Sequence, residues 1–235
     1  GAETYDFTWM GPYSYVLAEC TSETSARYRP LVRPVRQQSN GEAQAEYRSL
    51  IFARAGSSIR NLEDLRGKSF AFVEEQSTSG YLFPLARLIE ANLDPESDFE
   101  NVEFLGRHDR VVQSVLDGTY DAGAVYDDAR LEEFDSPSKA DEWLRVIART
   151  RPIPTSPITV SGSFAENHPD LVEQFVETMT SLHRSKRGKE ILNRLGIQRY
   201  QPVSDEDYDE VRNVLRTLLP RLTEIRDRCQ GRFSS

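Results

Sequence analysis

The sequence predicts an α/β fold of two lobes joined by a two-strand hinge. Along most of the 235 residues, segments typical of strands alternate with segments typical of amphipathic helices, and this alternation favours a mostly parallel sheet. Two extended passages, 47–54 and 145–160, have no helix beside them, and the second is rich in proline. Two such crossings are what a hinge requires, so we expect residues 1–53 and 151–235 in the first lobe and 54–150 in the second.

The charge of the chain argues against one class of partner. The net charge is -9 and the isoelectric point is near 5.0, whereas a nucleic-acid-binding protein needs a basic surface. A small anion is compatible, because a pocket can be locally positive on an acidic protein. No apolar run approaches the roughly 20 residues that span a bilayer, and the start, GAETYDF, is not a signal peptide. With three histidines and no CxxC or HExxH motif, we expect no metal site and no cofactor.

The elements expected in the first lobe are short. A strand at 5–10 precedes a helix at 13–20. Residues 29–37 alternate apolar and polar side chains around Pro34, which predicts an edge strand or an extended segment because proline cannot donate to a sheet ladder. Aromatic and β-branched residues at 47–54 predict a further strand.

Glycines end two of the helices expected in the second lobe. Gly67 closes a short helix in 56–68, and Gly118 closes the helix at 110–118, since glycine favours the left-handed conformation found after a helix. A further helix is expected at 82–93. The strands that we expect here are 69–74, 102–106, 120–126 and 144–149.

The C-terminal part is strongly helical. We expect a strand at 157–162 followed by helices at 171–185, 188–196 and 205–229. Pro220 lies inside the last helix and should bend or break it, because proline removes a backbone donor. Cys229, at the end of that helix, can pair with Cys20, or both can remain buried thiols, because sequence alone does not decide pairing.

Three hydroxyl residues and a glycine follow a predicted strand of the second lobe: Ser77, Thr78, Ser79 and Gly80. The first N–H groups of the next helix lack partners, and the helix dipole adds positive potential there. Neutral donors with little bulk suit a tetrahedral oxyanion, with Gly80 allowing a close approach of the backbone. The same residues are also ordinary helix caps. Pro84 lies too deep in a regular helix if Thr78 is the N-cap, so the helix begins one or two residues later or kinks.

A second candidate is GRHDR, residues 106–110, which also joins a strand to a helix. The ring N–H of His108 can donate to an anion, and Asp109 can cap the helix. Arg107 and Arg110 can add positive potential. The alternative is a solvated histidine in a loop.

Two other candidates stand beside predicted strands. Tyr47 opens the strand at 47–54, and its phenol can donate to a bound oxygen, or its ring simply packs there. Asp127 and Asp128 follow the strand at 120–126 and can accept from an amine or hydroxyl of a ligand, or remain solvated loop acids.

Eight motifs occur in an order typical of one family and cover nearly the whole chain. They are YDFTWMGPYSY, YRSLIFAR, SSIRNLEDLRGKSFAF, STSGYLFP, GRHD, YDAGAVYDD, RPIPTSPITV and ILNRLGIQRYQPVSDEDYDEVR. The chain thereby resembles the substrate-binding proteins of phosphonate, phosphite and phosphate ABC transporters. The STSG motif, the histidine about 30 residues later and the prolines around Ser156 are specific only in combination.

The resemblance implies a two-lobe periplasmic-binding fold of type II, with a phosphorus oxyanion in the cleft between the lobes. The residues that it assigns to the oxygens of the ligand are Ser77, Thr78, Ser79, His108 and Tyr47. Asp128 falls where an acidic residue can meet an amine on the ligand. It further implies a periplasmic or extracytoplasmic protein that performs no chemistry and delivers its ligand to an ABC permease in the membrane.

The chain departs from the family pattern in two places. Ser156 stands where the aminophosphonate-binding members have an acid, which favours phosphate, phosphite or a small alkyl phosphonate as the ligand. The family also has a strand–helix–strand unit before the DFTWMGP motif, which begins here at Asp6. We therefore expect an N-terminally incomplete first lobe, with an open strand edge and an exposed apolar patch.

Two other functions fit the same residues. One is the ligand-sensing domain of a membrane signalling protein with the same fold, since the helical C-terminus could continue toward a membrane. The other is an enzyme acting on phosphorylated substrates, but His108 has no activated nucleophile in the sequence around it. We expect a binding protein and not an enzyme.

Overall fold

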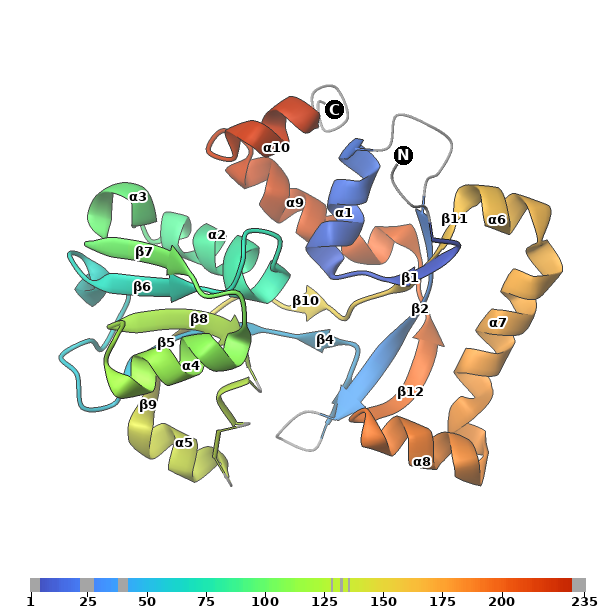
Figure 1. Ribbon diagram of the computed structural model, residues 1–235, viewed down its shortest axis with the longest axis horizontal. Helices are drawn as coiled ribbons and strands as arrows, with labels where there is room; N and C mark the ends of the chain where they lie inside the picture. Colours follow the sequence, from blue (N-terminus) through green and yellow to red (C-terminus); the bar gives the residue numbers. More distant parts are fainter. Residues whose placement is uncertain are drawn as a thin grey trace. The chain divides into compact units, whose positions relative to one another are not determined.

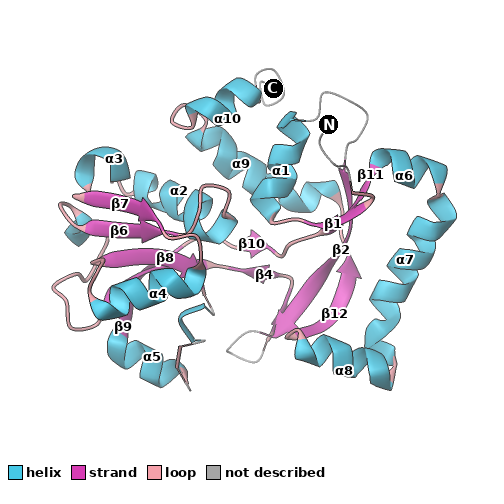
Figure 2. Ribbon diagram, in the orientation of Figure 1, coloured by secondary structure: helices cyan, strands magenta, loops and turns pink. Residues whose placement is uncertain are grey.

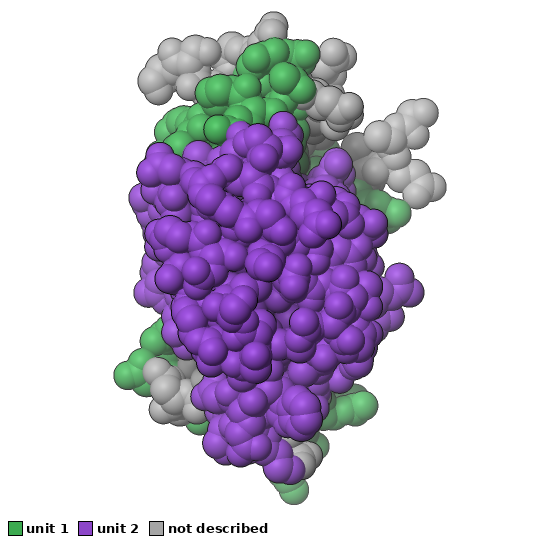
Figure 3. Space-filling model, turned by 90° about the vertical axis from the view of Figure 1, so that its left-hand side faces the viewer, with its two compact units in different colours: residues 1–46, 154–235 green, residues 47–153 purple. Residues whose placement is uncertain are grey.

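The computed structural model describes residues 5–21, 28–37, 42–127, 129–131, 133–134 and 136–229. The chain folds into two compact units, unit 1 with residues 1–46 and 154–235 and unit 2 with residues 47–153 (Figure 3). The sequence boundaries at 53 and 150 differ from these. Residues 49–54 belong to unit 2, because they pair with strands of that unit on both sides.

Unit 2 is built on a five-stranded sheet with the order β7-β6-β8-β5-β9 (Figure 1). Its strands are β5 (Ser49–Arg54), β6 (Ser69–Phe72), β7 (Asn101–Phe104), β8 (Ala122–Tyr126) and β9 (Leu144–Arg149). β6 runs parallel to β7 and β8, whereas β5 runs antiparallel to β8 and β9. The strands are rich in apolar residues because both faces of this sheet are covered.

Alternate side chains of these strands enter two hydrophobic clusters, one on each face of the sheet. Phe72 belongs to the cluster that includes residues of α2 (Phe83–Glu90), and Val73 belongs to the cluster that includes residues of α4 (His108–Asp117). This alternation is the period of two that an extended chain dictates. The remaining helices of unit 2 are α3 (Pro95–Asp98) and α5 (Pro137–Trp143) (Figure 2).

Unit 1 contains a second sheet, whose described ladders are all antiparallel. The order is β1-β11-β2-β12, with β3 paired to β2. Its strands are β1 (Phe7–Trp9), β2 (Tyr28–Gln37), β3 (Ala43–Gln44), β11 (Ile158–Ser161) and β12 (Ile197–Pro202). The expectation of a mostly parallel sheet was wrong, because among the described strands parallel pairing is confined to the β7-β6-β8 part of unit 2.

β2 is not the edge strand that its proline predicted. It lies between β11 and β12, but the two partners cover different halves: β11 pairs with residues 28–32 and β12 with residues 32–36. Most positions of β2 therefore have a partner strand on one side only, which tolerates Pro34. The Pro34 carbonyl accepts a hydrogen bond from Thr155 Oγ1 at 2.7 Å.

The described α-helices of unit 1 are α1 (Pro12–Thr21), α6 (Gly162–Asn167), α7 (Pro169–Ser181), α8 (Lys186–Arg194), α9 (Asp209–Leu218) and α10 (Thr223–Arg228). Residues of α7 and α8 pack on Val32 and Ile197 of the sheet. The break expected at Pro220 is confirmed, since α9 ends before it and α10 begins after it. None of the helices in the described part of the chain is long and apolar enough to cross a membrane.

Two aromatic residues are exposed on or just before β1. Among the described strands β1 has one partner, β11. Trp9 on this strand is 50% exposed, and Tyr5 just before it is 61% exposed. Leu171 on α7 is also half exposed.

The chain passes between the units at 46/47 and at 153/154. These passages lie in β4 (Glu46–Tyr47) and β10 (Ile153–Pro154), which pair with each other as a two-stranded sheet. The hinge predicted from the sequence thus corresponds to two short strands that are hydrogen-bonded to one another.

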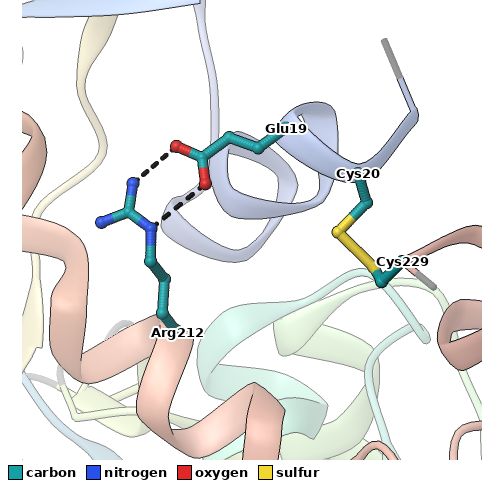
Figure 4. The surroundings of a disulfide bond; sticks show 4 residues. All are labelled: Glu19, Cys20, Arg212 and Cys229. Carbon is teal, nitrogen blue, oxygen red and sulfur yellow. Dashed lines mark hydrogen bonds and ion pairs between the residues drawn. A yellow bond between two sulfur atoms is a disulfide. The ribbon is translucent and has the colours of Figure 1, made fainter. Parts of the chain in front are cut away.

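In unit 1, a disulfide joins Cys20 of α1 to Cys229, directly after α10 (Figure 4). Both half-cystines are buried. The neighbouring residue Glu19 accepts two hydrogen bonds from Arg212 of α9, at 2.5 and 3.1 Å. The first helix of unit 1 is therefore held to the C-terminal helices by one covalent and one ionic link.

Replacing Cys20 and Cys229 by alanine should lower the free energy of unfolding by about 2–4 kcal/mol. The bond links positions 209 residues apart, and a cross-link stabilises chiefly by restricting the unfolded chain. Urea unfolding of the variant and of the oxidised and reduced wild type measures this. Equal midpoints for the variant and the oxidised wild type would exclude a stabilising role.

Candidate functional site

The strand-to-helix junctions that carry the STSG motif and His108 lie at one edge of the unit 2 sheet. Because β6, β7 and β8 are parallel, their carboxyl ends meet at the same edge. β5 is antiparallel to β8, so its amino end lies there as well, with Ser49 opposite Tyr126. We call this the carboxyl edge of unit 2. In sheets of this kind ligands bind outside the carboxyl ends of the strands.

The STSG motif forms a π-helical turn, Thr78–Leu82, which precedes α2. Ser77 is its N-cap: the Ser77 Oγ accepts from the Gly80 N–H at 2.9 Å, and the Ser77 carbonyl accepts from the Leu82 N–H at 3.0 Å. The wider turn moves the start of α2 to Phe83, so that Pro84 falls in the first turn of the helix, where proline is tolerated. The depth of Pro84 is thereby explained.

Gly80 has a packing role that the sequence did not predict. A Cβ placed on Gly80 would overlap the side chain of Val73 and lie 2.8 Å from the Ser77 Oγ. The Gly80 carbonyl also accepts from the Val73 N–H at 3.1 Å. The absence of a side chain is therefore required by the end of β6 and does not depend on a ligand.

Thr78 and Ser79 are almost completely buried, each 4% exposed. Ser77 is partly exposed. The hydroxyl groups of Thr78 and Ser79 therefore lie within the protein near the start of a helix, where few water molecules compete for hydrogen bonds. Such surroundings strengthen hydrogen bonds to an anion.

The loop that carries His108 lies beside this turn. The Val73 carbonyl accepts from the Gly106 N–H at 2.6 Å, while the Val73 N–H donates to Gly80. Val73 thus connects the turn after β6 to the loop after β7. The two strongest candidates from the sequence meet at neighbouring strand ends.

His108 is the first residue of α4 and is largely withdrawn from solvent. Its ring contacts Tyr126 of β8 edge-on, with centroids 4.7 Å apart. The buried Nδ1 has no hydrogen-bond partner among the residues that the structure describes. Burial lowers the pKa of His108 to about 4, and the nearby Asp109 opposes this shift only in part. The imidazole is therefore neutral at pH 7.

Asp109 does not cap α4, as the sequence suggested. The N-cap is Arg107, without a capping side-chain bond. Asp109 instead accepts two hydrogen bonds from the Arg107 guanidinium, at 2.7 and 2.9 Å. This pairing lowers the pKa of Asp109 and offsets the positive charge that Arg107 was expected to offer to a ligand.

Replacing His108 by phenylalanine should reduce the dependence of stability on pH. Below its ordinary pKa of 6.5, His108 takes up a proton in the unfolded chain but resists it in the folded state until about pH 4. Its contribution is therefore full above pH 6.5 and falls as the pH drops toward 4, by on the order of 2 kcal/mol. Urea unfolding at pH 7.5 and 4.5 tests this. An equal loss of stability in both proteins would show that His108 does not titrate this way.

Of the remaining candidates, Tyr47 is the last residue of β4 and comes two residues before Ser49, where β5 begins. Asp127 pairs with the backbone of Arg48: its N–H donates to the Arg48 carbonyl at 2.9 Å, and its carboxylate accepts from the Arg48 N–H at 3.3 Å. Asp128 lies outside the described residues. Ser156 lies in unit 1, between β10 and β11, and its carbonyl accepts from Trp9 Nε1 at 3.0 Å.

Sequence reasoning missed two buried hydroxyl residues at this edge, Ser49 and Thr150. Both were treated only as parts of extended segments, although a serine that opens an otherwise apolar strand is a weak polar signal. Ser49 is fully buried and donates to the Ser79 carbonyl. In the described part of the chain, no cluster of three or more His, Cys, Asp or Glu side chains could hold a metal ion.

These elements define a mixed α/β protein with the fold of a periplasmic binding protein of type II. The model of the family described as "ABC transporter, phosphonate, periplasmic substrate-binding protein" matches residues 1–208. The chain belongs to this family. The expectation drawn from the eight sequence motifs is thus confirmed.

One similar protein is the "Phosphate-import protein PhnD" of Mycolicibacterium smegmatis, which is 31% identical over 133 residues. The match covers 54% of this chain and 40% of the length of that protein.

Solved structures share the fold at lower identity. PhnD1 from Prochlorococcus marinus, in complex with methylphosphonate, has a TM-score of 0.73 at 21% identity, covering 91% of this chain and 78% of its own. A binding protein component of an ABC phosphonate transporter from Pseudomonas aeruginosa also has a TM-score of 0.73, at 20% identity, covering 95% of this chain and 77% of its own.

Proposed function

We propose that this protein is the solute-binding component of an ABC transporter and that it binds a phosphorus oxyanion (phosphonate, phosphite or phosphate) at the carboxyl edge of unit 2. The observation that carries the proposal is the π-helical turn with its N-cap Ser77 and the buried Thr78 and Ser79. Membership in the phosphonate family supports it. We further propose that units 1 and 2 correspond to the two lobes and that the protein works outside the cytoplasm with a membrane permease.

The chemistry of the turn suits an anion more than a neutral solute. Hydroxyl groups and the first amides of a helix donate hydrogen bonds without carrying a full charge. The Ser77 Oγ accepts one bond from Gly80, and its own O–H can still donate. Tetrahedral oxygens on phosphorus match several such donors. The proposed ligand-binding residues are Tyr47, Ser77, Thr78, Ser79, His108, Asp128 and Ser156.

The neutral His108 fits a binding role better than a catalytic one. A neutral imidazole can donate one N–H to a ligand oxygen, and its low pKa keeps it unprotonated at pH 7. General acid–base catalysis is most effective when the pKa of the group lies near the working pH. We therefore propose that the protein performs no chemistry. Turnover of a phosphate ester that is lost in a His108→Ala variant would contradict this.

A ligand that carries an amine should bind more weakly than one without it. Ser156 stands in the sequence where aminophosphonate-binding relatives have a carboxylate, so an ammonium would meet one close acid at most, Asp128. Burying a charge with incomplete pairing is costly. We expect aminoethylphosphonate to bind less tightly than methylphosphonate or phosphite in calorimetric titrations. The reverse order would refute this prediction of ligand specificity.

A thermal-shift panel tests the proposed function broadly. The panel consists of phosphate, phosphite, methylphosphonate and sulfate. A ligand at about 100 times its dissociation constant adds roughly 2.7 kcal/mol to the free energy of unfolding, so at least one phosphorus compound should raise the melting temperature by several degrees. Stabilisation by sulfate alone, or by none of the four, would contradict the proposal.

A further inference from the structure

One carbonyl group of the π-helical turn has lost its helical donor. In a π-helix each carbonyl accepts from the N–H five residues later, as Ser77 does from Leu82 and Thr78 from Phe83. The next carbonyl, that of Ser79, would accept from residue 84. That residue is Pro84, which has no N–H.

Ser49 supplies the missing donor. Its hydroxyl donates to the Ser79 carbonyl and also lies 3.2 Å from the Val125 carbonyl. Ser49 is 0% exposed, so water cannot replace this bond. An unsatisfied buried carbonyl costs free energy. Because Pro84 offers no N–H to the Ser79 carbonyl, the hydrogen bond from Ser49 stabilises this part of the turn.

Ser49 is in turn fixed by Thr150. The Ser49 N–H donates to the Thr150 Oγ1 at 3.0 Å, and the Thr150 N–H donates to the Ser49 carbonyl at 3.0 Å. Thr150 is 4% exposed. Its carbonyl accepts from the Arg48 guanidinium at 2.6 Å.

These residues adjoin the two passages between the units. Ser49 follows β4 by two residues, and Thr150 precedes β10 by three. Ser49 thus contacts the turn directly, and the Ser49–Thr150 pair lies within three residues of each chain passage in the sequence.

We infer that Ser49 and Thr150 are positioning residues: they hold the Ser77–Leu82 turn in its anion-binding geometry and link it to the segments that enter and leave unit 2. The inference rests on the proposed function of that turn. In this proposal neither residue touches the anion. Ser49 acts through its hydrogen bond to the Ser79 carbonyl, and Thr150 acts through its hydrogen bonds to the backbone of Ser49.

The test compares Ser49→Ala with a matched control, Ser114→Ala. Ser114 is also a buried serine of unit 2, and its hydroxyl donates to the Val111 carbonyl at 2.9 Å, within α4. In the ligand-free protein, Ser49→Ala should speed amide hydrogen exchange of residues 77–83 about three- to tenfold, the effect of one lost hydrogen bond. Ser114→Ala should leave exchange there within about twofold of the wild type.

Binding and coupling provide the second measurement. Ser49→Ala and Thr150→Val should each weaken methylphosphonate binding about three- to tenfold in calorimetry. Pro84→Ala restores an N–H that can serve the Ser79 carbonyl, so Ser49→Ala should cost less affinity in that background than in the wild type. A merely structural serine would show additive effects. If Ser49→Ala does not fold, Thr150→Val carries the same test.

Two failures can be told apart. If the wild type binds none of phosphate, phosphite and methylphosphonate, the proposed function fails and this inference with it. If the wild type binds but Ser49→Ala matches Ser114→Ala in both exchange and affinity, only the inference is overturned.

Discussion

Replacing Ser77 and Thr78 together by alanine is expected to weaken binding of the phosphorus oxyanion by about two to four orders of magnitude. Hydrogen bonds to a charged group are worth about 1.5–3 kcal/mol each, and tenfold in affinity corresponds to about 1.4 kcal/mol. Ser77 is the N-cap of the π-helical turn, and Thr78, the first residue of the turn, is 4% exposed. Calorimetric titration of the wild type and the double variant measures the loss.

The control for this variant must separate binding from helix capping, because Ser77 also accepts from the Gly80 N–H. Ser185 provides the match. It caps α8 in the same way, accepting from the Gly188 N–H at 2.9 Å. Ser185→Ala should lose about 1 kcal/mol of stability, as Ser77→Ala should, and retain wild-type affinity. Equal affinity of the wild type and the Ser77→Ala/Thr78→Ala variant would refute the role of the turn.

The second large effect concerns stability. Arg212→Met should lower the free energy of unfolding by about 3–5 kcal/mol, the cost of removing one partner of a buried ion pair. The Arg212 side chain is 7% exposed and that of Glu19 is 12% exposed. Arg212 also contacts Asp205 and Asp209. Without the guanidinium, Glu19 would remain a buried charge without its main partner.

Two further variants make the Arg212 prediction specific. Arg226→Met removes an exposed arginine that pairs with Asp227 at 3.4 Å, and it should cost less than about 1 kcal/mol. Adding Glu19→Gln to Arg212→Met should recover part of the loss, because the neutral amide is less costly to bury. A loss for Arg212→Met no larger than that for Arg226→Met, in urea unfolding, would show that the pair contributes little.

Much of unit 2 could be predicted from the sequence because its local signals agree with its tertiary structure. Short apolar runs in the sequence correspond to β6 and β8, and the helix before Gly118 ends at that glycine. These signals come from residues close together in the sequence. The place of β2 could not be predicted in this way. Its prolines are typical of an edge, but the two partners divide the strand between them, and this arrangement depends on residues far away in the sequence.

The candidate site shows the same division. The STSG motif and His108 stand out locally, as polar residues at strand-to-helix junctions. The only sign of the π-helical turn in the sequence was Pro84, which lies too far into a regular helix for a residue without an N–H. Ser49 gave almost no signal, because its importance follows from a carbonyl 30 residues later in the chain. Gly80 was noticed, but its reason, contact with Val73, is tertiary.

The most direct test of the central claim is a crystal structure of the protein with methylphosphonate. The account predicts phosphonate oxygens within roughly 2.6–3.2 Å of the hydroxyls of Ser77 and Thr78 and of an imidazole nitrogen of His108. The Ser49 hydroxyl should remain on the Ser79 carbonyl. A ligand bound elsewhere, with the Ser77–Leu82 turn making no contact to it, would contradict the account.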